Sequence, residues 1–167
     1  MSLLPILRYP DLRLKTLAAP IDEIDDDIRN LARDMAETMY GAPGIGLAAT
    51  QVDIHKRLIV VDASETRDQL LVLINPELIE SEGSRFGEEG CLSVPGIYDK
   101  IERAERVVVD YLDLDGNRRR IEAGGMLSVC LQHEMEHLDG KIFVEYLSAL
   151  KQKRIRSKLL KQARITA

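Results

Sequence analysis

The stretch VCLQHEMEHLDG, residues Val129 to Gly140, contains the pattern H-E-x-x-H. Its two histidines, His133 and His137, are four positions apart. Residues with this spacing lie on one face of an α-helix, so both imidazoles can bind the same ion. Glu134 lies beside that face, where a carboxylate can take a proton from a water on the ion. The stretch therefore predicts a metal-binding helix.

The competing interpretation is a surface helix on which these residues fall by chance. The apolar residues before the pattern argue against it, because Met126, Leu127, Val129 and Cys130 are typical of an interior helix. Polar side chains buried there without partners would each cost roughly several kcal/mol. A bound ion would supply the missing partner.

The third ligand of such an ion does not follow directly from the pattern. Some H-E-x-x-H enzymes use a glutamate well downstream, but the last acidic residue here is Glu145, too close to His137. Others extend the pattern to H-E-x-x-H-x-x-G-x-x-H. In this chain Phe143 occupies the last position and cannot bind a metal.

Three other residues could supply the ligand. Cys130 would lie about 7 Å along the helix axis from the metal at 1.5 Å per residue, so it is predicted to be a core residue. His55 lies among charged residues and is predicted to be at the surface. Cys91, in FGEEGCLSVPG, remains. A thiolate and two imidazoles suit a first-row divalent ion such as Fe or Zn, with a fourth position open to water. A buried structural cysteine is the alternative.

The rest of the chain predicts an α+β fold. Helices are expected in DDDIRNLARDMAETMYGAPG (25–44), ending near Gly41, and over 124–140 and 146–164, the last apolar at Leu147, Leu150, Leu159 and Leu160. Strands are expected over 57–64 and 70–77, and a hairpin over 106–123 turning at Asp115-Gly116. This order favours mainly antiparallel strands around a central metal-binding helix, with an N-terminal and a C-terminal helix, in one domain spanning residues 1–167.

Composition agrees with an ordinary globular chain, at 45% hydrophobic and 31% charged residues. Two cysteines in 167 residues do not make a disulfide framework. We find no segment resembling a signal peptide and no apolar run long enough for a membrane span. A cytoplasmic location and no membrane partner are therefore expected.

Charge is distributed unevenly along the chain. The net charge is −5, yet residues 146–167 carry seven basic residues and no acidic one. Such a basic helix is either a solvated face of the body or a surface that attracts a polyanion.

The segment GIGLAA, Gly44 to Ala49, matches a dinucleotide-binding pattern. That pattern follows a strand and opens a helix, whereas here a predicted helix precedes it and a strand follows, so we reject a nucleotide site. The two glycines instead indicate close approach of backbone to a ligand. Gln51, just beyond, carries an amide that can donate to a carbonyl oxygen.

Three segments together resemble peptide deformylase. That family carries G-x-G-L-A-A-x-Q, E-G-C-L-S and Q-H-E-x-D-H. This chain has GIGLAATQ (44–51), EGCLS (89–93) and QHEMEH (132–137), in the same order and with similar spacing. Glu136 stands where the family usually has Asp, and Thr50 where many members have Pro. Glu136 is expected to point away from the metal and to alter only an outer contact.

The resemblance implies removal of the N-formyl group from the initiating methionine of new chains, with release of formate. It implies a single divalent ion bound by Cys91, His133 and His137, natively Fe(II), with Zn, Ni or Co as possible replacements. Glu134 would deprotonate the attacking water and then protonate the leaving amine. Gln51 and the backbone N–H of Leu92 would stabilise the oxyanion.

The resemblance also implies which residues bind the substrate. It places the methionine slot and the extended peptide near Gly44, Ile45, Gly46, Val129 and Cys130, with Glu89 behind the metal ligands. Arg103 would brace Glu89 or the peptide, or lie exposed on a hairpin. The basic C-terminal helix would dock on the ribosome, and the protein is expected to be a monomer. The competing functions are a metallopeptidase that cuts internal bonds and a non-catalytic metal- or ribosome-binding module.

Overall fold

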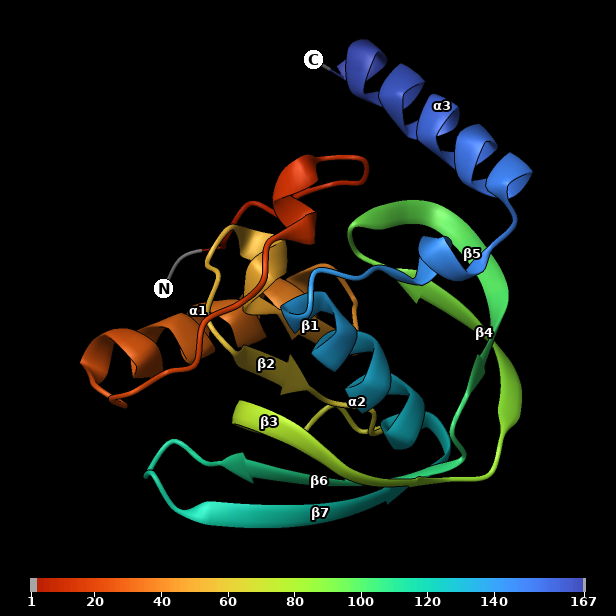
Figure 1. The fold of residues 1–167 in the computed structure, drawn as a ribbon. Coiled ribbons are helices and arrows are strands. Elements are labelled where there is room, and N and C mark those ends of the chain that lie inside the picture. The colour runs from red at the N-terminus through yellow and green to blue at the C-terminus, as the bar shows by residue number, and fades with distance from the viewer. Residues whose placement is uncertain (1–2, 167) are drawn as a thin grey trace.

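The computed structural model describes residues 3–166 and has an α+β fold (Figure 1). Its α-helices are α1 (Asp26–Gly41), α2 (Gly125–Leu138) and α3 (Ala149–Thr166). Short 3-10 helices span Leu12–Lys15, Ala49–Val52 and Phe143–Tyr146. None of the helices in this part of the chain has both the length and the apolar character that a membrane crossing needs.

The strands form two sheets in which every pairing of named strands is antiparallel, as expected. The larger sheet has the order β1-β2-β3-β6-β7, with bounds Gly46–Ala48, Leu58–Val61, Leu71–Glu82, Arg106–Leu112 and Arg118–Gly124. The smaller sheet pairs β4 (Arg85–Cys91) with β5 (Val94–Arg103).

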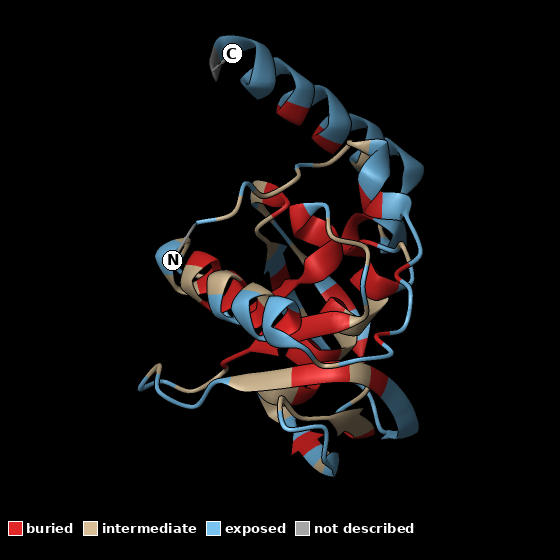
Figure 2. Ribbon diagram, turned by 90° about the vertical axis from the view of Figure 1, so that its left-hand side faces the viewer, coloured by how far each residue is buried: buried red, intermediate tan, exposed pale blue. Residues whose placement is uncertain are grey.

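Helix α2 is the centre of the molecule, lying between the larger sheet and the β4–β5 hairpin (Figure 1). Buried residues concentrate on α2 and on the strands beneath it, whereas α3 is largely exposed (Figure 2). Cys130, Leu131 and Leu138 of α2 pack in one cluster with residues of β2, β3, β6 and β7. The helix that carries the H-E-x-x-H pattern is therefore interior, as Val129 and Cys130 predicted, although Met126 at its first turn is 49% exposed.

Helix α1 begins and ends as the sequence predicted. The Asp25 side chain accepts a hydrogen bond from the backbone N–H of Ile28 at 3.0 Å, which caps the N-terminus. Asp26 and Asp27 follow in the first turn, where carboxylates suit the positive end of the helix dipole. The helix ends at Gly41, and a short connection leads from there to β1.

Helix α3 buries a narrower face than its leucines predicted. Of the four leucines on the predicted apolar face, Leu159 is buried and Leu147 partly buried, whereas Leu150 is 58% and Leu160 39% exposed. Ile155 and Leu159 make the contact instead, in a cluster with Val94 and Ile101 of β5. Ile155 and Leu159 are four positions apart and so lie on the same face of the helix, which is the single face of α3 that packs against the rest of the protein.

The hairpin of β4 and β5 was not predicted, because Arg85–Cys91 lacks a run of β-branched residues and contains two glycines. Strand β3 also extends five residues past the expected end at Glu77, with irregular register against β6. The β6–β7 hairpin is confirmed, but its connection spans residues 113–117 and not Asp115-Gly116 alone.

Candidate active site

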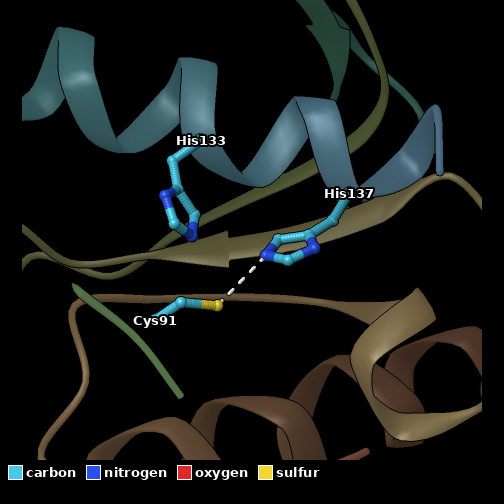
Figure 3. Close-up of side chains that lie close together, drawn as sticks. All are labelled: Cys91, His133 and His137. Carbon is cyan, nitrogen blue, oxygen red and sulfur yellow. Dashed lines mark hydrogen bonds between the residues drawn. The ribbon is translucent and has the colours of Figure 1, made fainter. Parts of the chain in front are cut away.

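Two elements bring three metal-binding side chains together (Figure 3). Helix α2 supplies His133 and His137 from adjacent turns, and Cys91 ends strand β4. One potential ligand atom from each lies within 4.8 Å of the other two. The Cys91 Sγ is 3.4 Å from His137 Nε2. The site is thus a Cys/His/His set that suits one metal ion, whose identity the geometry does not specify.

The two other candidates from the sequence are elsewhere. Cys130 is buried and its Sγ lies 3.6 Å from the carbonyl oxygen of Ile45, in agreement with a core role. His55 is partly exposed and pairs with Asp53 at 2.9 Å. Neither belongs to the metal-binding group found among residues 3–166.

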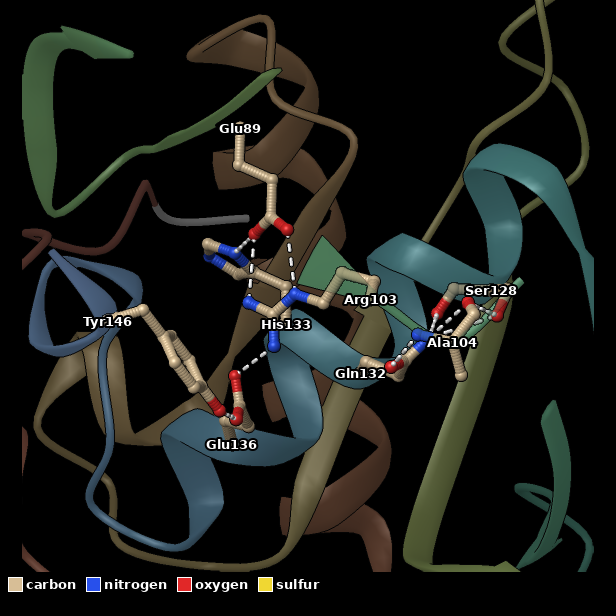
Figure 4. Close-up of polar contacts among 8 residues, drawn as sticks. All are labelled: Glu89, Arg103, Ala104, Ser128, Gln132, His133, Glu136 and Tyr146. Carbon is tan, nitrogen blue, oxygen red and sulfur yellow. Dashed lines mark hydrogen bonds and ion pairs between the residues drawn. The ribbon is translucent and has the colours of Figure 1, made fainter. Parts of the chain in front are cut away.

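Glu89 fixes the orientation of His133 (Figure 4). Its Oε1 lies 2.8 Å from His133 Nδ1, so that nitrogen donates to the carboxylate and Nε2 is left as the ligand atom. Arg103 donates to the same carboxylate through Nε at 2.7 Å and Nη2 at 2.9 Å. The sequence left the role of Arg103 open; the structure shows that it is buried and braces Glu89.

Glu136 makes the outer contact that was expected of it. It pairs with Nη1 of Arg103 and accepts a hydrogen bond from the hydroxyl of Tyr146, so it faces away from the metal ligands (Figure 4). Tyr146 also lies under the Arg103 guanidinium, 5.3 Å from ring centroid to Cζ. No sequence pattern predicts this role for Tyr146, which lies ten positions after Glu136 and beyond the end of α2.

Burial shifts the pKa values of His137 and Glu134 within the candidate site. Burial lowers the pKa of His137 well below its usual value, so His137 is neutral and able to bind metal. Burial raises the pKa of Glu134 to about 7. Within residues 3–166, Glu134 Oε1 and His137 Nδ1 are buried without a hydrogen-bond partner. A carboxyl group with this pKa can exchange protons near neutral pH.

Gln51 extends its amide into the site. Its Oε1 accepts from the backbone N–H of Ala48 at 2.9 Å, which leaves Nε2 to donate to Ser93 Oγ at 3.0 Å and toward Cys91 Sγ at 3.5 Å. The side chain is 1% exposed, so its direction is fixed by these partners. Ser93 lies within the EGCLS segment, but the sequence pattern does not predict this contact.

A cavity of about 390 Å³ opens beside the metal-binding group. The predicted residues Gly44, Ile45, Gly46, Gln51, Cys91, Leu92, His133 and Glu134 line it, together with Tyr98 and others that the sequence did not single out. Val129 and Cys130 are buried and are not among its lining residues. A larger cavity of about 630 Å³ lies by Arg103 and Tyr146, but no metal-binding residue lines it.

Comparison with known proteins identifies this arrangement. The family model described as polypeptide deformylase matches residues 3–153. Peptide deformylase 2 of Nitrosomonas europaea is 62% identical over 164 residues, covering 98% of this chain and 89% of that protein. Peptide deformylase 1 of Burkholderia multivorans is 58% identical, covering 98% of this chain and 91% of that protein.

Solved structures agree with the sequence relatives. The crystal structure of a peptide deformylase from Legionella pneumophila superposes with a TM-score of 0.94 at 44% identity, covering 99% of this chain and 98% of that one. The enzyme from Ehrlichia chaffeensis in complex with actinonin gives a TM-score of 0.94 at 41% identity, over 97% and 98% of the two chains. The α+β fold, the Cys/His/His group and these relatives together establish that the chain belongs to the peptide deformylase family.

Proposed function

We propose that this protein is a metal-dependent hydrolase that removes the N-formyl group from the N-terminal formyl-methionine of newly made polypeptides and releases formate. The observation that carries the proposal is the convergence of Cys91, His133 and His137 beside the Glu134 carboxylate and the Gln51 amide. All of these residues except the fully buried His137 line one cavity. Membership of the deformylase family supports the reaction.

Cys91, His133 and His137 would hold one divalent ion. The residues fit it, because His137 is neutral, His133 is oriented by Glu89, and the three ligand atoms are close enough to share one centre. Three protein ligands leave a coordination position for water or substrate. When bound, the ion supplies Lewis acidity and lowers the pKa of water. We propose Fe(II) as the native ion, with Zn, Ni and Co as alternatives that the same donors accept.

Glu134 would act as the general base and then the general acid. It is buried beside His133, and its Oε1 is free of hydrogen-bond partners in the described chain. With a pKa of about 7 it can accept a proton from the attacking water and pass it to the leaving amine. Gly46 is essential to this geometry, since any side chain there would overlap the Glu134 carboxylate.

Gln51 would stabilise the oxyanion that forms on the formyl carbon, together with the backbone N–H of Leu92. The Gln51 amide is already aimed at the Cys91 side of the site by Ala48 and Ser93. A preorganised donor of this kind contributes on the order of 3 kcal/mol to transition-state stabilisation. Ala48 and Ser93 hold the amide before substrate arrives, so only the N–H that points toward Cys91 would have to turn to the oxyanion.

The peptide would lie along the cavity wall formed by Gly44, Ile45 and Gly46. Val129 and Cys130 would bound the methionine slot from the α2 side, behind the lining residues. Glu89 would act on substrate only through His133. We further propose that the protein works as a monomer in the cytoplasm, and that the exposed basic face of α3 docks on the ribosome, where RNA phosphates favour such charge.

Formate release from a formyl-Met tripeptide tests the reaction. The protein would be purified without oxygen and its metal content assayed on the same sample, since Fe(II) and a thiolate can both be oxidised. The expected result is release from the formyl peptide that scales with bound metal, and none from the acetyl-Met peptide. A fully metallated sample that releases no formate would contradict the proposal. Cleavage of a blocked internal peptide would instead indicate a metallopeptidase.

A further inference from the structure

The segment Gly44–Gly46 separates the cavity from the loop that follows β2. On the cavity side, the side chains of Leu92 and Glu134 pack closely against this segment. A Cβ at Gly44 would come within 2.7 Å of Leu92 Cδ1, and one at Gly46 would overlap the Glu134 carboxylate. A small shift of this segment would therefore change the width of the cavity next to the catalytic carboxylate.

Two residues of the loop hold the same segment from its other side. Arg67 Nη2 donates to the Gly44 carbonyl oxygen at 2.6 Å. The backbone N–H of Asp62 donates to the Ile45 carbonyl oxygen at 2.8 Å. Consecutive carbonyl groups of the cavity wall are thus both anchored to the loop, and one of the two anchors is a charged side chain.

Arg67 is itself held in an uncommon conformation. Its φ is +58°, a left-handed value that only a few per cent of non-glycine residues adopt. Its guanidinium lies over the ring of Tyr40, 5.0 Å from Cζ to the ring centroid, and the Tyr40 hydroxyl donates to Asp62 Oδ2 at 2.6 Å. Such backbone strain persists where surrounding contacts impose it, and it concentrates at functional sites.

We propose that Arg67 is a positioning residue for the peptide substrate, which acts by holding the Gly44 carbonyl and so the cavity wall in place. It touches neither the metal ligands nor the reacting atoms, and it acts through Gly44. The Arg67 guanidinium is oriented by the ring of Tyr40 and by the backbone carbonyl of Asp62, to which its Nη1 donates at 3.5 Å. This inference rests on the proposed function and extends it to a residue outside the cavity.

The consequence is a specific kinetic signature. Without the guanidinium, the wall would occupy displaced positions for part of the time. Apparent substrate affinity would then equal the intrinsic affinity multiplied by the fraction of molecules whose wall is in the binding position. Glu134, Gln51 and the metal ligands are untouched, so bound substrate reacts at its normal rate. Loss of Arg67 should therefore raise KM and leave kcat nearly unchanged. Global unfolding would do the reverse, lowering kcat through loss of active molecules.

The test compares Arg67→Met, which keeps the aliphatic stem without a donor, with Arg67→Lys, which keeps a cationic donor. Arg33→Met, at an exposed position of α1, is the matched control. With the formyl-Met tripeptide, Arg67→Met should raise KM about tenfold, equivalent to about 1.4 kcal/mol of binding. Its kcat should stay within about twofold of the parent. Arg67→Lys should recover part of the KM, and metal content should be equal in all variants.

An unchanged KM in Arg67→Met would overturn the inference, and so would a loss confined to kcat. Equal KM values for the Met and Lys variants would also overturn it, because the donor would then have no role. These outcomes differ from failure of the proposed function. In that case the metallated parent itself would release no formate, and Arg67 would have no such substrate to position.

Discussion

Arg103 and Glu89 form a buried ion pair behind the metal-binding group, with Nε 2.7 Å from Oε2 and side chains only 4% and 5% exposed. Glu89 in turn orients His133. Arg103, which lies 14 positions after Glu89 in the sequence, therefore supports the geometry of the metal site through that carboxylate. Loss of a carboxylate that orients a ligand histidine typically costs about 10- to 100-fold in metal affinity or activity.

The variant Arg103→Met should lose about 3–5 kcal/mol of unfolding free energy, because it leaves Glu89 buried without its cation. Metal affinity should fall as well, since His133 is then less firmly oriented. Denaturant unfolding and metal titration measure the two effects. Arg85→Met is the matched control, because its pairing with Glu105 at 3.5 Å is partly exposed and should contribute less than about 1 kcal/mol. Equal losses in both variants would refute this view of Arg103.

Glu134→Gln should bind metal normally and lose turnover. Removing a general acid–base group costs about a hundredfold to ten-thousandfold in rate. Formate release and metal content on the same sample check both statements. Glu136→Asp, also on α2, is the control, because it keeps a carboxylate near Arg103 and should remain active. Parental turnover in Glu134→Gln would show that another group is the base.

The contrast between Glu134 and Arg103 shows what the sequence could predict. His133, Glu134 and His137 lie within one helix, and their spacing predicts a metal site. Cys91 is predicted as the third ligand because the chain has only two cysteines and one further histidine. The contacts of Arg103 with Glu89 and Glu136 join residues 14 and 33 apart. No periodicity encodes such pairings, because they depend on how the β4–β5 hairpin packs against α2.

The fold shows the same division. Helices α1 and α2 were predicted because their apolar residues recur at helical spacing and their ends carry stop signals. Strand β4 was not, because Gly87 and Gly90 have low strand propensity and its pairing with β5 is a tertiary effect. In α3, Leu150 and Ile155 are both apolar, and only the position of β5 determines which of them is buried.

Gly46→Ala should remove most activity without unfolding the protein. A methyl group there would overlap the Glu134 carboxylate and displace it, and a misplacement of about 1 Å can cost roughly a hundredfold in rate. Steady-state formate release measures the loss. Gly87→Ala is the control, because an added Cβ there meets no atom within 4 Å. An active Gly46→Ala variant would mean that Glu134 has room to move.

Asp62 should contribute a pH-dependent part of the stability. Burial alone would raise its pKa, but hydrogen bonds from Ser64, Tyr40 and the backbone lower it from 3.8 to about 2. A depressed pKa stabilises the fold above the unfolded value, and this contribution is lost as pH falls through the folded value. Asp62→Asn should therefore be less stable than the parent at neutral pH, with the gap narrowing between about pH 4 and pH 2.

Unfolding free energies of both proteins across that range measure the effect of Asp62. Glu88→Gln, at an exposed position of β4, serves as the control and should run parallel to the parent. A gap that stays constant as the pH falls would contradict the assigned pKa. A gap that widens as the pH falls would mean that folding raises the pKa of Asp62 and does not lower it.

The basic face of α3 can be tested without disturbing its packing. Ile155 and Leu159 anchor the helix, whereas Lys153 and Lys158 are exposed. Changing these two lysines to Gln should weaken ribosome binding, most clearly at low salt, because phosphate contacts release counterions. Turnover of a free formyl peptide should not change. The control removes the same charge from Lys56 and Lys141, exposed on the body. Co-sedimentation over a salt series measures binding, and equal losses in both double variants would mean that net charge, and not α3, governs the interaction.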